Sequence, residues 1–180
     1  PQTVRVSGSR LLSSTGSQTI KMEGSRLVGY RAVTIAGMRD PNVIANIDAV
    51  TQRAQAMAFA NLQGIDTSRV MVHWRPYGRD AVLGMHDPDR HNVPHEIGLM
   101  IEVIADTQEL ANTVLALLRS SALHCPFEGR TTTAGNLAFP FSPSDLVGGP
   151  VYEFSVYHLL EADNPLKLFP YDVITLGARQ

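Results

Sequence analysis

The sequence predicts an α+β domain of the ferredoxin-like type, a split βαβ arrangement in which two helices cover one face of an antiparallel sheet. Strand-like and helix-like periods follow one another in the order strand, helix, strand, strand, helix, strand over residues 30–159. Both helical stretches have an apolar stripe to bury against a sheet. Residues 96–105 are almost continuously apolar, which is typical of a central strand. The first and third strands would lie side by side in the centre, and the second face of the sheet would need another cover.

The strands are predicted by apolar residues that alternate with polar ones or run together. Four stretches of this kind make the sheet: 30–36, 69–76, 96–105 and 151–159. Turn-forming residues dominate 77–94, where one short strand is expected at 81–85. The C-terminal tail would add a peripheral strand at 172–176.

Two helices are predicted by apolar positions that recur every three or four residues: 41–63 and 107–122. Asp40 is expected to be the N-cap of the first helix, because Pro41 suits the first helical position. Gly64 would end this helix, since glycine tolerates a left-handed C-cap. Asp106 is expected to cap the second helix, with Glu109 at capping-box spacing.

The N-terminal residues give a weaker pattern. Residues 3–9 and 18–22 alternate, and glycine and serine residues between them favour a turn. We therefore predict a β-hairpin whose loop lies around 10–17. The chain would then consist of a hairpin extension over 1–29 and the ferredoxin-like domain over 30–180.

The composition excludes several classes of function. The 180 residues fit one domain, and 44% apolar and 18% charged side chains are ordinary for a globular chain. A net charge of -2 provides no basic surface for nucleic acid or an anionic membrane, and no apolar run reaches the ~20 residues of a membrane span. Cys125 is the single cysteine, so an internal disulfide is excluded and a reducing cytoplasm is expected. Because the chain opens with Pro1 rather than methionine, we expect it to be a piece of a longer protein.

The stretch 129–145, GRTTTAGNLAFPFSPSD, mixes hydroxyl, amide and charged side chains with phenylalanine and proline. One interpretation is an ordered functional loop, in which Leu137, Phe139 and Phe141 are at least partly buried as anchors and the polar groups stay available to a ligand. The alternative is a packed connection whose hydroxyl groups bond to their own backbone.

An anion site is one way for this loop to function. Ser142 would cap a short helical turn with Pro143 at its first position, leaving backbone N–H groups free to meet a carboxylate or phosphate. Arg130 and Asn136 would add a forked donor and an amide. Asp145 opposes this interpretation, because its carboxylate would occupy the cap and repel an anion.

Arg39 lies between a strand end and a helix start, where ligand sites often form, although it would serve equally well as a solvated cation. The residues predicted to bind a ligand are therefore Arg39, Arg130, Asn136, Ser142 and Ser144.

Catalytic residues are not established by the sequence, and the weak candidates for a general base are Glu153 and His158 on the last strand. No metal or cofactor is predicted. His91 and His95 are four residues apart, but Pro94 between them argues against one helical metal-binding face.

Several stretches resemble one family. They are GMRDP at 37–41, HEIGLMIEV at 95–103, PFEGRTTTAGNLAFPFSPSD at 126–145 and GPVYEFSVYHLLE at 149–161. Together they resemble the C-terminal part of the acyclic terpene utilisation AtuA-like proteins, which are bacterial and fungal proteins catalogued as a domain of unknown function. Members of that family usually carry a larger N-terminal domain before this region.

The resemblance implies a role in the catabolism of branched isoprenoid acids, which are handled as coenzyme A thioesters, and implies no catalytic residues. The function expected first is binding of a carboxylate or acyl-CoA ligand. The alternative is a non-catalytic module for homo-oligomerisation or for docking to the N-terminal domain, and a third possibility is a complete small enzyme. Ligand-induced stabilisation would separate the first two.

Overall fold

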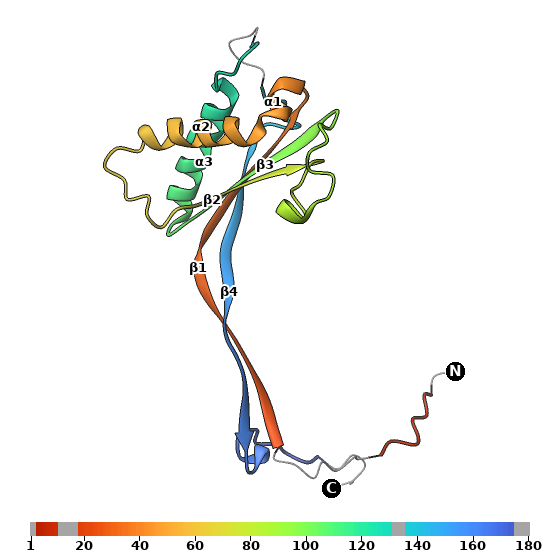
Figure 1. Ribbon diagram of the computed structural model, residues 1–180. Coiled ribbons are helices and arrows are strands. Elements are labelled where there is room, and N and C mark those ends of the chain that lie inside the picture. Colours follow the sequence, from red (N-terminus) through yellow and green to blue (C-terminus); the bar gives the residue numbers. More distant parts are fainter. Residues whose placement is uncertain (1–2, 11–17, 131–135, 175–180) are drawn as a thin grey trace. The chain divides into compact units, whose positions relative to one another are not determined.

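The computed structural model, shown in Figure 1, describes residues 3–10, 18–130 and 136–174 of the chain. Its strands are β1 (Gln18–Met38), β2 (Met71–Tyr77), β3 (Ile97–Ala105) and β4 (Asp145–Ala162). Its α-helices are α1 (Pro41–Ala45), α2 (Ile47–Ala60) and α3 (Gln108–His124), and two 3-10 helices are η1 (Gly84–His86) and η2 (Pro165–Lys167). The chain divides into unit 1, which holds Pro1–Arg26 and Phe154–Gln180, and unit 2, which holds Leu27–Glu153.

Unit 2 contains an antiparallel sheet with the strand order β2-β3-β1-β4. Nine residue pairs join β1 to β3, from Tyr30↔Ala105 to Met38↔Ile97, and seven join β2 to β3. The predicted α+β class with a four-stranded antiparallel sheet is therefore confirmed. β3 is hydrogen-bonded on both sides, as its continuous apolar sequence suggested.

The core lies between one face of this sheet and the helices (Figure 1). The sheet contributes alternate residues, because successive side chains of a strand point to opposite faces. Ala32, Ala36 and Met38 of β1 and every odd-numbered residue of β3 are buried in this way. Val114, Leu115 and Leu118 of α3, among others, close the core from the helical side.

The first predicted helix is present but divided. Asp40 is its N-cap as predicted, because its carboxylate accepts hydrogen bonds from the N–H groups of Asn42 (2.8 Å) and Val43 (3.2 Å). α1 ends at Ala45 and α2 begins at Ile47. At the break, the Asn46 side-chain amide donates to the carbonyl of Asn42 at 2.9 Å, competing with the helical backbone for that acceptor.

The cap of α3 is Thr107 and not Asp106 as predicted. The Thr107 hydroxyl accepts a hydrogen bond from the Leu110 N–H at 3.1 Å. The Asp106 carboxylate instead lies 3.1 Å from the Arg69 guanidinium. The strand predicted at 81–85 is also wrong, because these residues form turns and the start of η1.

The predicted N-terminal hairpin is wrong. Residues 3–10 form no strand, and the proposed loop falls partly on 11–17, outside the described residues. Residues 18–22 instead begin β1, which runs beside β4 (Figure 1). A strand needs a hydrogen-bonded partner, and here the partner lies at the other end of the chain. Of the tail strand predicted at 172–176, residues 172–174 form no strand and 175–176 are not described.

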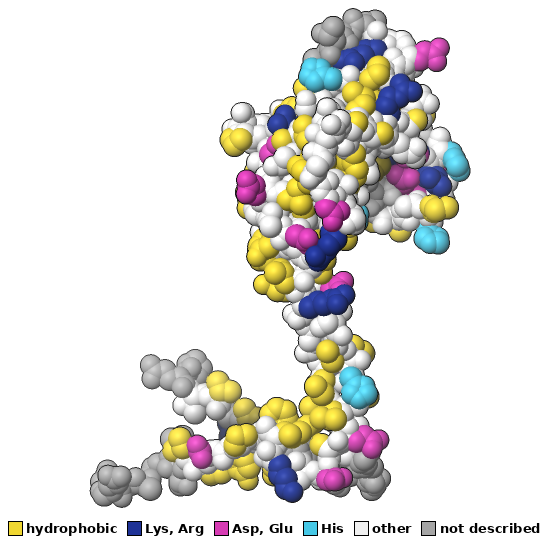
Figure 2. All heavy atoms as spheres, turned by 90° about the vertical axis from the view of Figure 1, so that its left-hand side faces the viewer, with side chains coloured by type: hydrophobic (Ala, Val, Ile, Leu, Met, Phe, Trp, Pro, Cys, Tyr) yellow, Lys and Arg dark blue, Asp and Glu magenta, His cyan; other side chains and the backbone are white. Residues whose placement is uncertain are grey.

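Unit 1 contains the outer parts of β1 and β4 as a two-stranded ribbon. Among the residues of this unit whose burial is described, none is buried. Only Ile20, Gly24 and Ala162 of these are half-buried. A Cβ atom at Gly24 would lie 3.2 Å from the Cβ of Val156, so the two strands approach closely there. Hydrophobic side chains are prominent over this unit in Figure 2.

Candidate functional site

Two of the predicted ligand-binding residues cap the C-terminal end of α3. Arg130 Nη1 donates to the carbonyls of His124 at 2.7 Å and Cys125 at 3.3 Å. Asn136 Nδ2 donates to the carbonyls of Ala122 at 3.1 Å and Cys125 at 3.0 Å, and its side chain is buried. The last carbonyls of an α-helix have no partner within the helix, so these donors satisfy them. The amide of Asn136 is thereby committed to the fold.

The helical turn predicted after Ser142 is wrong. Residues 141–143 form a bend, and β4 begins at Asp145. The Asp145 carboxylate accepts hydrogen bonds from Arg119 Nε at 2.7 Å and from the Ser144 hydroxyl at 3.3 Å. Thr34 of β1 donates its hydroxyl hydrogen to the Ser144 carbonyl at 2.9 Å. Because strand pairing and Arg119 organise this segment, it presents no free helical N–H groups to an anion.

The apolar anchors of the loop are partly as predicted. Leu137 is buried and Phe139 is half-buried against the core, with the Arg119 guanidinium 5.8 Å from the Phe139 ring centre. Phe141 is exposed, so its predicted anchoring role is wrong. Ala138 exchanges two backbone hydrogen bonds with Gly37, at 2.8 and 2.9 Å. The three threonines of the loop lie within 131–135, outside the described residues.

The other predicted site residues lie apart from one another. Arg39 is exposed and its Nη1 lies 3.8 Å from Glu96 Oε2, which is a weak surface pair. Glu153 is the last residue of unit 2, and His158 belongs to unit 1. Both side chains are exposed on β4. Neither lies in the desolvated surroundings that tune a general base, so the geometry does not favour the enzyme interpretation.

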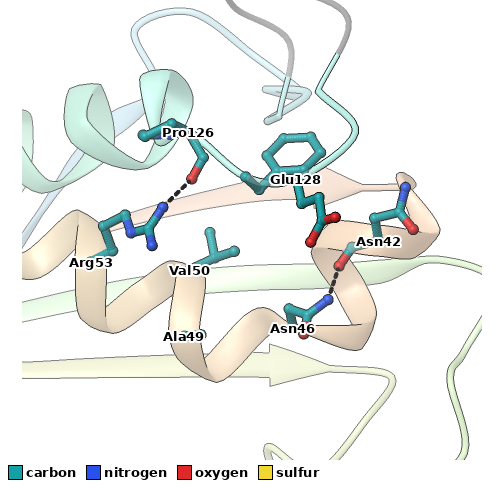
Figure 3. Close-up of a pocket in the computed structure, with 8 residues that line it drawn as sticks. Asn42, Asn46, Ala49, Val50, Arg53, Pro126 and Glu128 are labelled. Atoms are coloured by element: carbon teal, nitrogen blue, oxygen red, sulfur yellow. Dashed lines mark hydrogen bonds between the residues drawn. The ribbon is translucent and has the colours of Figure 1, made fainter.

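A cavity of about 190 Å³ lies between the start of α2 and the segment that follows α3 (Figure 3). Arg53 crosses it to donate Nη1 to the Pro126 carbonyl at 3.0 Å. The Glu128 side chain is directed toward Asn42 in Figure 3. Small-molecule sites usually enclose about 300 Å³ or more. This cavity is smaller, and its arginine is already used to hold the backbone, so we assign it no substrate.

A charge cluster that the sequence did not reveal lies on the sheet face opposite the helices. Glu102 of β3 is almost fully buried between Arg31 of β1 and Arg75 of β2. Arg31 Nε lies 2.5 Å from Glu102 Oε1, and Arg75 Nη2 donates to Oε2. The two arginines are diagonal cross-strand neighbours of Glu102, whose directly paired residues are Val33 and His73.

The electrostatics of this cluster favour an ionised Glu102. Burial opposes ionisation, but the hydrogen bond and charge of Arg75, together with the charge of Arg31, outweigh it and lower the pKa of Glu102 below its usual value. Two guanidinium groups share one carboxylate, so the cluster carries a net positive charge. The signal that could have revealed this cluster is a glutamate within a continuously apolar strand, because a buried carboxylate needs a partner of opposite charge.

Cys125 is inert in this fold. Its side chain is fully buried, and burial raises the pKa of the thiol. The Sγ atom lies 3.6 Å from the Val50 carbonyl. A reactive cysteine needs an exposed thiolate, which these surroundings disfavour.

Comparison with protein-family models finds none that matches the chain, and comparison with curated proteins finds no matching relative. Within residues 3–10, 18–130 and 136–174, no three His, Cys, Asp or Glu side chains are grouped so that they would hold a metal ion. In the same part of the chain, no helix has the length and apolar character required to cross a membrane.

Proposed function

We propose that this protein is an assembly module and that unit 1 completes its structure by pairing with unit 1 of a second copy of the chain. The observation that carries the proposal is the absence of any buried side chain among the residues of unit 1 for which burial is described. An isolated two-stranded ribbon is marginal in water, because it has no core to offset its loss of conformational entropy. A second ribbon would supply the missing cover.

The side chains of the ribbon support such an interface. Phe154 and Val156 lie on one face of β4 and Tyr157 and Leu159 on the other, and all four are exposed. Apolar and aromatic residues gathered in this way usually mark an interaction surface. Both faces of the ribbon would therefore gain from burial.

The backbone of the ribbon supports the same partner. β4 is the edge strand of the sheet, and in the described residues β3 pairs with β1 only over Tyr30–Met38. The outer part of β1 thus offers a second edge. Unpaired strand edges are templates for another strand. An identical ribbon has a matching length, and pairing of like surfaces about a two-fold axis gives a closed dimer.

Charge is compatible with self-association. The strand residues of the ribbon carry Lys21 and Arg26 beside Glu23 and Glu161, so both signs are present in equal number. Lys21 already forms a pair with Glu23 at 2.5 Å and lies 5.0 Å from the Tyr157 ring centre. Two copies would therefore meet without a strong like-charge field.

We prefer this assembly function to the alternative in which the 129–145 loop binds a ligand. Arg130 and Asn136 cap α3, and Ser142 starts no helix. The loop thus lacks the arrangement of donors that motivated an anion site there.

We also propose a ferredoxin-like topology for unit 2. It is supported by the element order and by the central positions of β1 and β3 in the order β2-β3-β1-β4. Membership of the AtuA-like family is a further proposal, supported by the strings AGNLAFPFSPSD and GPVYEFSVYH. A cytoplasmic location is supported by the single, buried cysteine.

The test is size-exclusion chromatography with light scattering over a range of protein concentrations. We expect the measured mass of the wild type to be at least twice the 19.6 kDa of one chain. Phe154→Ser combined with Tyr157→Ser, one change on each face of the ribbon, should return the mass to one chain. The control is Val82→Ser combined with Leu83→Ser, which alters exposed apolar residues of unit 2 and should leave the mass unchanged.

The three α-helices of the described residues all belong to unit 2, so an unchanged helical circular dichroism spectrum shows that the ribbon variant keeps that unit folded. A wild type that stays at one chain at every concentration would refute the proposal. So would an oligomer that the ribbon variant leaves intact.

A further inference from the structure

The two faces of the ribbon in unit 1 can be told apart by the contacts between its strands. Successive residues of a strand point to opposite faces. A Cβ atom at Gly24 would lie 3.2 Å from the Cβ of Val156, so even-numbered residues of β1 and β4 share one face. Lys21 Nζ lies 5.0 Å from the Tyr157 ring centre, which places odd-numbered residues of both strands on the other face. The two contacts agree, and every residue of 18–26 and 154–162 is thereby assigned to a face.

The even-numbered face, which we name the apolar face, holds most of the apolar side chains of the ribbon. These are Ile20, Met22, Phe154, Val156, Leu160 and Ala162. Its other residues are Gly24 and the polar residues Gln18, Arg26 and His158. A surface of this composition gains free energy when it leaves water.

The odd-numbered face, which we name the charged face, is suited to water. It carries Lys21, Glu23 and Glu161 beside Tyr157 and Leu159. Lys21 pairs with Glu23 at 2.5 Å and also lies near the Tyr157 ring, so its charge is balanced on the ribbon itself. Burying this face would remove water from these charges without supplying new partners.

Burial also differs between the two faces. The half-buried residues of 18–26 and 154–162 are Ile20, Gly24 and Ala162, and all three belong to the apolar face. Leu160 on the apolar face is 38% exposed, whereas its neighbour Leu159 on the charged face is 60% exposed. Within 3–10 and 163–174, every residue whose burial is described is exposed, so none of them is packed into the apolar face.

On the basis of the assembly proposed above, we infer that the second copy packs on the apolar face and that the charged face stays in water. Pairing of strand edges alone would leave both faces in water, so hydrogen bonds would form without burial of the apolar side chains. Two apolar faces packed against each other at ~10 Å, as stacked sheets are, provide the core that the single ribbon lacks.

Charge favours a second copy as the occupant of this face. Within the ribbon, the apolar face has no Asp or Glu that would attract a basic partner, and Arg26 alone attracts an acidic one only weakly. Arg26 is the last residue of unit 1 before Leu27 of unit 2 and so lies at one end of the ribbon. If the two ribbons run in opposite directions, their Arg26 side chains lie at opposite ends of the interface and like charges do not meet at its centre.

The test compares Leu160→Lys with Leu159→Lys, which place the same charge on adjacent residues of opposite faces. Both variants and the wild type are measured by size-exclusion chromatography with light scattering over a range of concentrations. Leu160→Lys would bury an unpaired ammonium group from each copy, so its dissociation constant should rise about a hundredfold or more. Leu159→Lys should associate as the wild type does, because its ammonium group stays in water.

The reactivity of an introduced thiol gives a second measurement that needs no disruptive substitution. Cys125 is fully buried, so a water-soluble thiol reagent reads the introduced cysteine. In Leu160→Cys, the reaction should be several-fold slower when the chain is associated than after dilution to single chains. In Leu159→Cys, the rate should be the same under both conditions.

The failure of this inference can be distinguished from the failure of the assembly itself. A wild type that stays a single chain at every concentration would refute the assembly and, with it, the packing on the apolar face. If the wild type associates, equal weakening by the two lysine variants, or no weakening by Leu160→Lys, would overturn the choice of face alone. A Leu160→Cys thiol that reacts equally fast in associated and single chains would do the same.

Discussion

Replacing Glu102 by glutamine removes a buried negative charge that two arginines share. Losing one partner of a buried ion pair costs about 3–5 kcal/mol. The side chains of Arg31 and Arg75 are 37% and 36% exposed, so water would take over part of their interaction. We therefore expect Glu102→Gln to lower the free energy of unfolding by about 2 kcal/mol, mainly because the two guanidinium groups then repel each other without the carboxylate between them.

Glu96→Gln is the matched control. Its side chain is 63% exposed, and its carboxylate lies 3.8 Å from Arg39, so the same change should cost less than about 0.5 kcal/mol. Both variants are compared with the wild type by urea unfolding at neutral pH. An equal effect of the two substitutions, or a neutral Glu102→Gln, would refute the assignment of the cluster as a stabilising feature.

The pH dependence gives a second readout of the same cluster. The pKa of Glu102 is lower in the folded protein than its ordinary value of 4.5. The ionised carboxylate therefore stabilises the fold above pH 4.5, and this contribution is lost as the pH falls from 4.5 through the folded pKa. The stability difference between wild type and Glu102→Gln should shrink over that window and stay constant above it.

Two further predictions concern the loop after α3. Asn136→Ala should cost about 2 kcal/mol in urea unfolding, because it removes two buried hydrogen bonds, to the carbonyls of Ala122 and Cys125. Asn61→Ala removes a single exposed bond, to the Met57 carbonyl at the end of α2, and should cost less than about 1 kcal/mol. Phe139→Ala should cost about 2 kcal/mol because the ring is half-buried, while Phe141→Ala should change stability by less than about 0.5 kcal/mol. Equal costs within either pair would contradict these assignments.

The sheet and helices of unit 2 could be predicted because burial of one face makes apolar residues recur at the spacing of a strand or a helix. Residues 30–36 and 96–105 carry such patterns, and both lie in strands that face the core. The full lengths of β1 and β4 could not be predicted. Residues 18–22 and 151–159 alternate and do lie in these strands, but the outer parts pair in a ribbon in which no described residue is buried, so burial does not mark where the strands begin and end.

The candidate site was predicted less well, because donors that suit an anion also suit the end of a helix. Arg130 and Asn136 meet carbonyl oxygens 5 to 14 residues earlier in the chain, and that proximity depends on how the loop folds back. A signal was nevertheless present in the sequence. α3 ends at His124 with Cys125 and Pro126 after it, and a helix without glycine or asparagine at this point lacks the left-handed cap that usually satisfies its last carbonyls. Those carbonyls must then receive donors from elsewhere, and the next side-chain donors of this strength along the chain are an arginine and, after it, an asparagine.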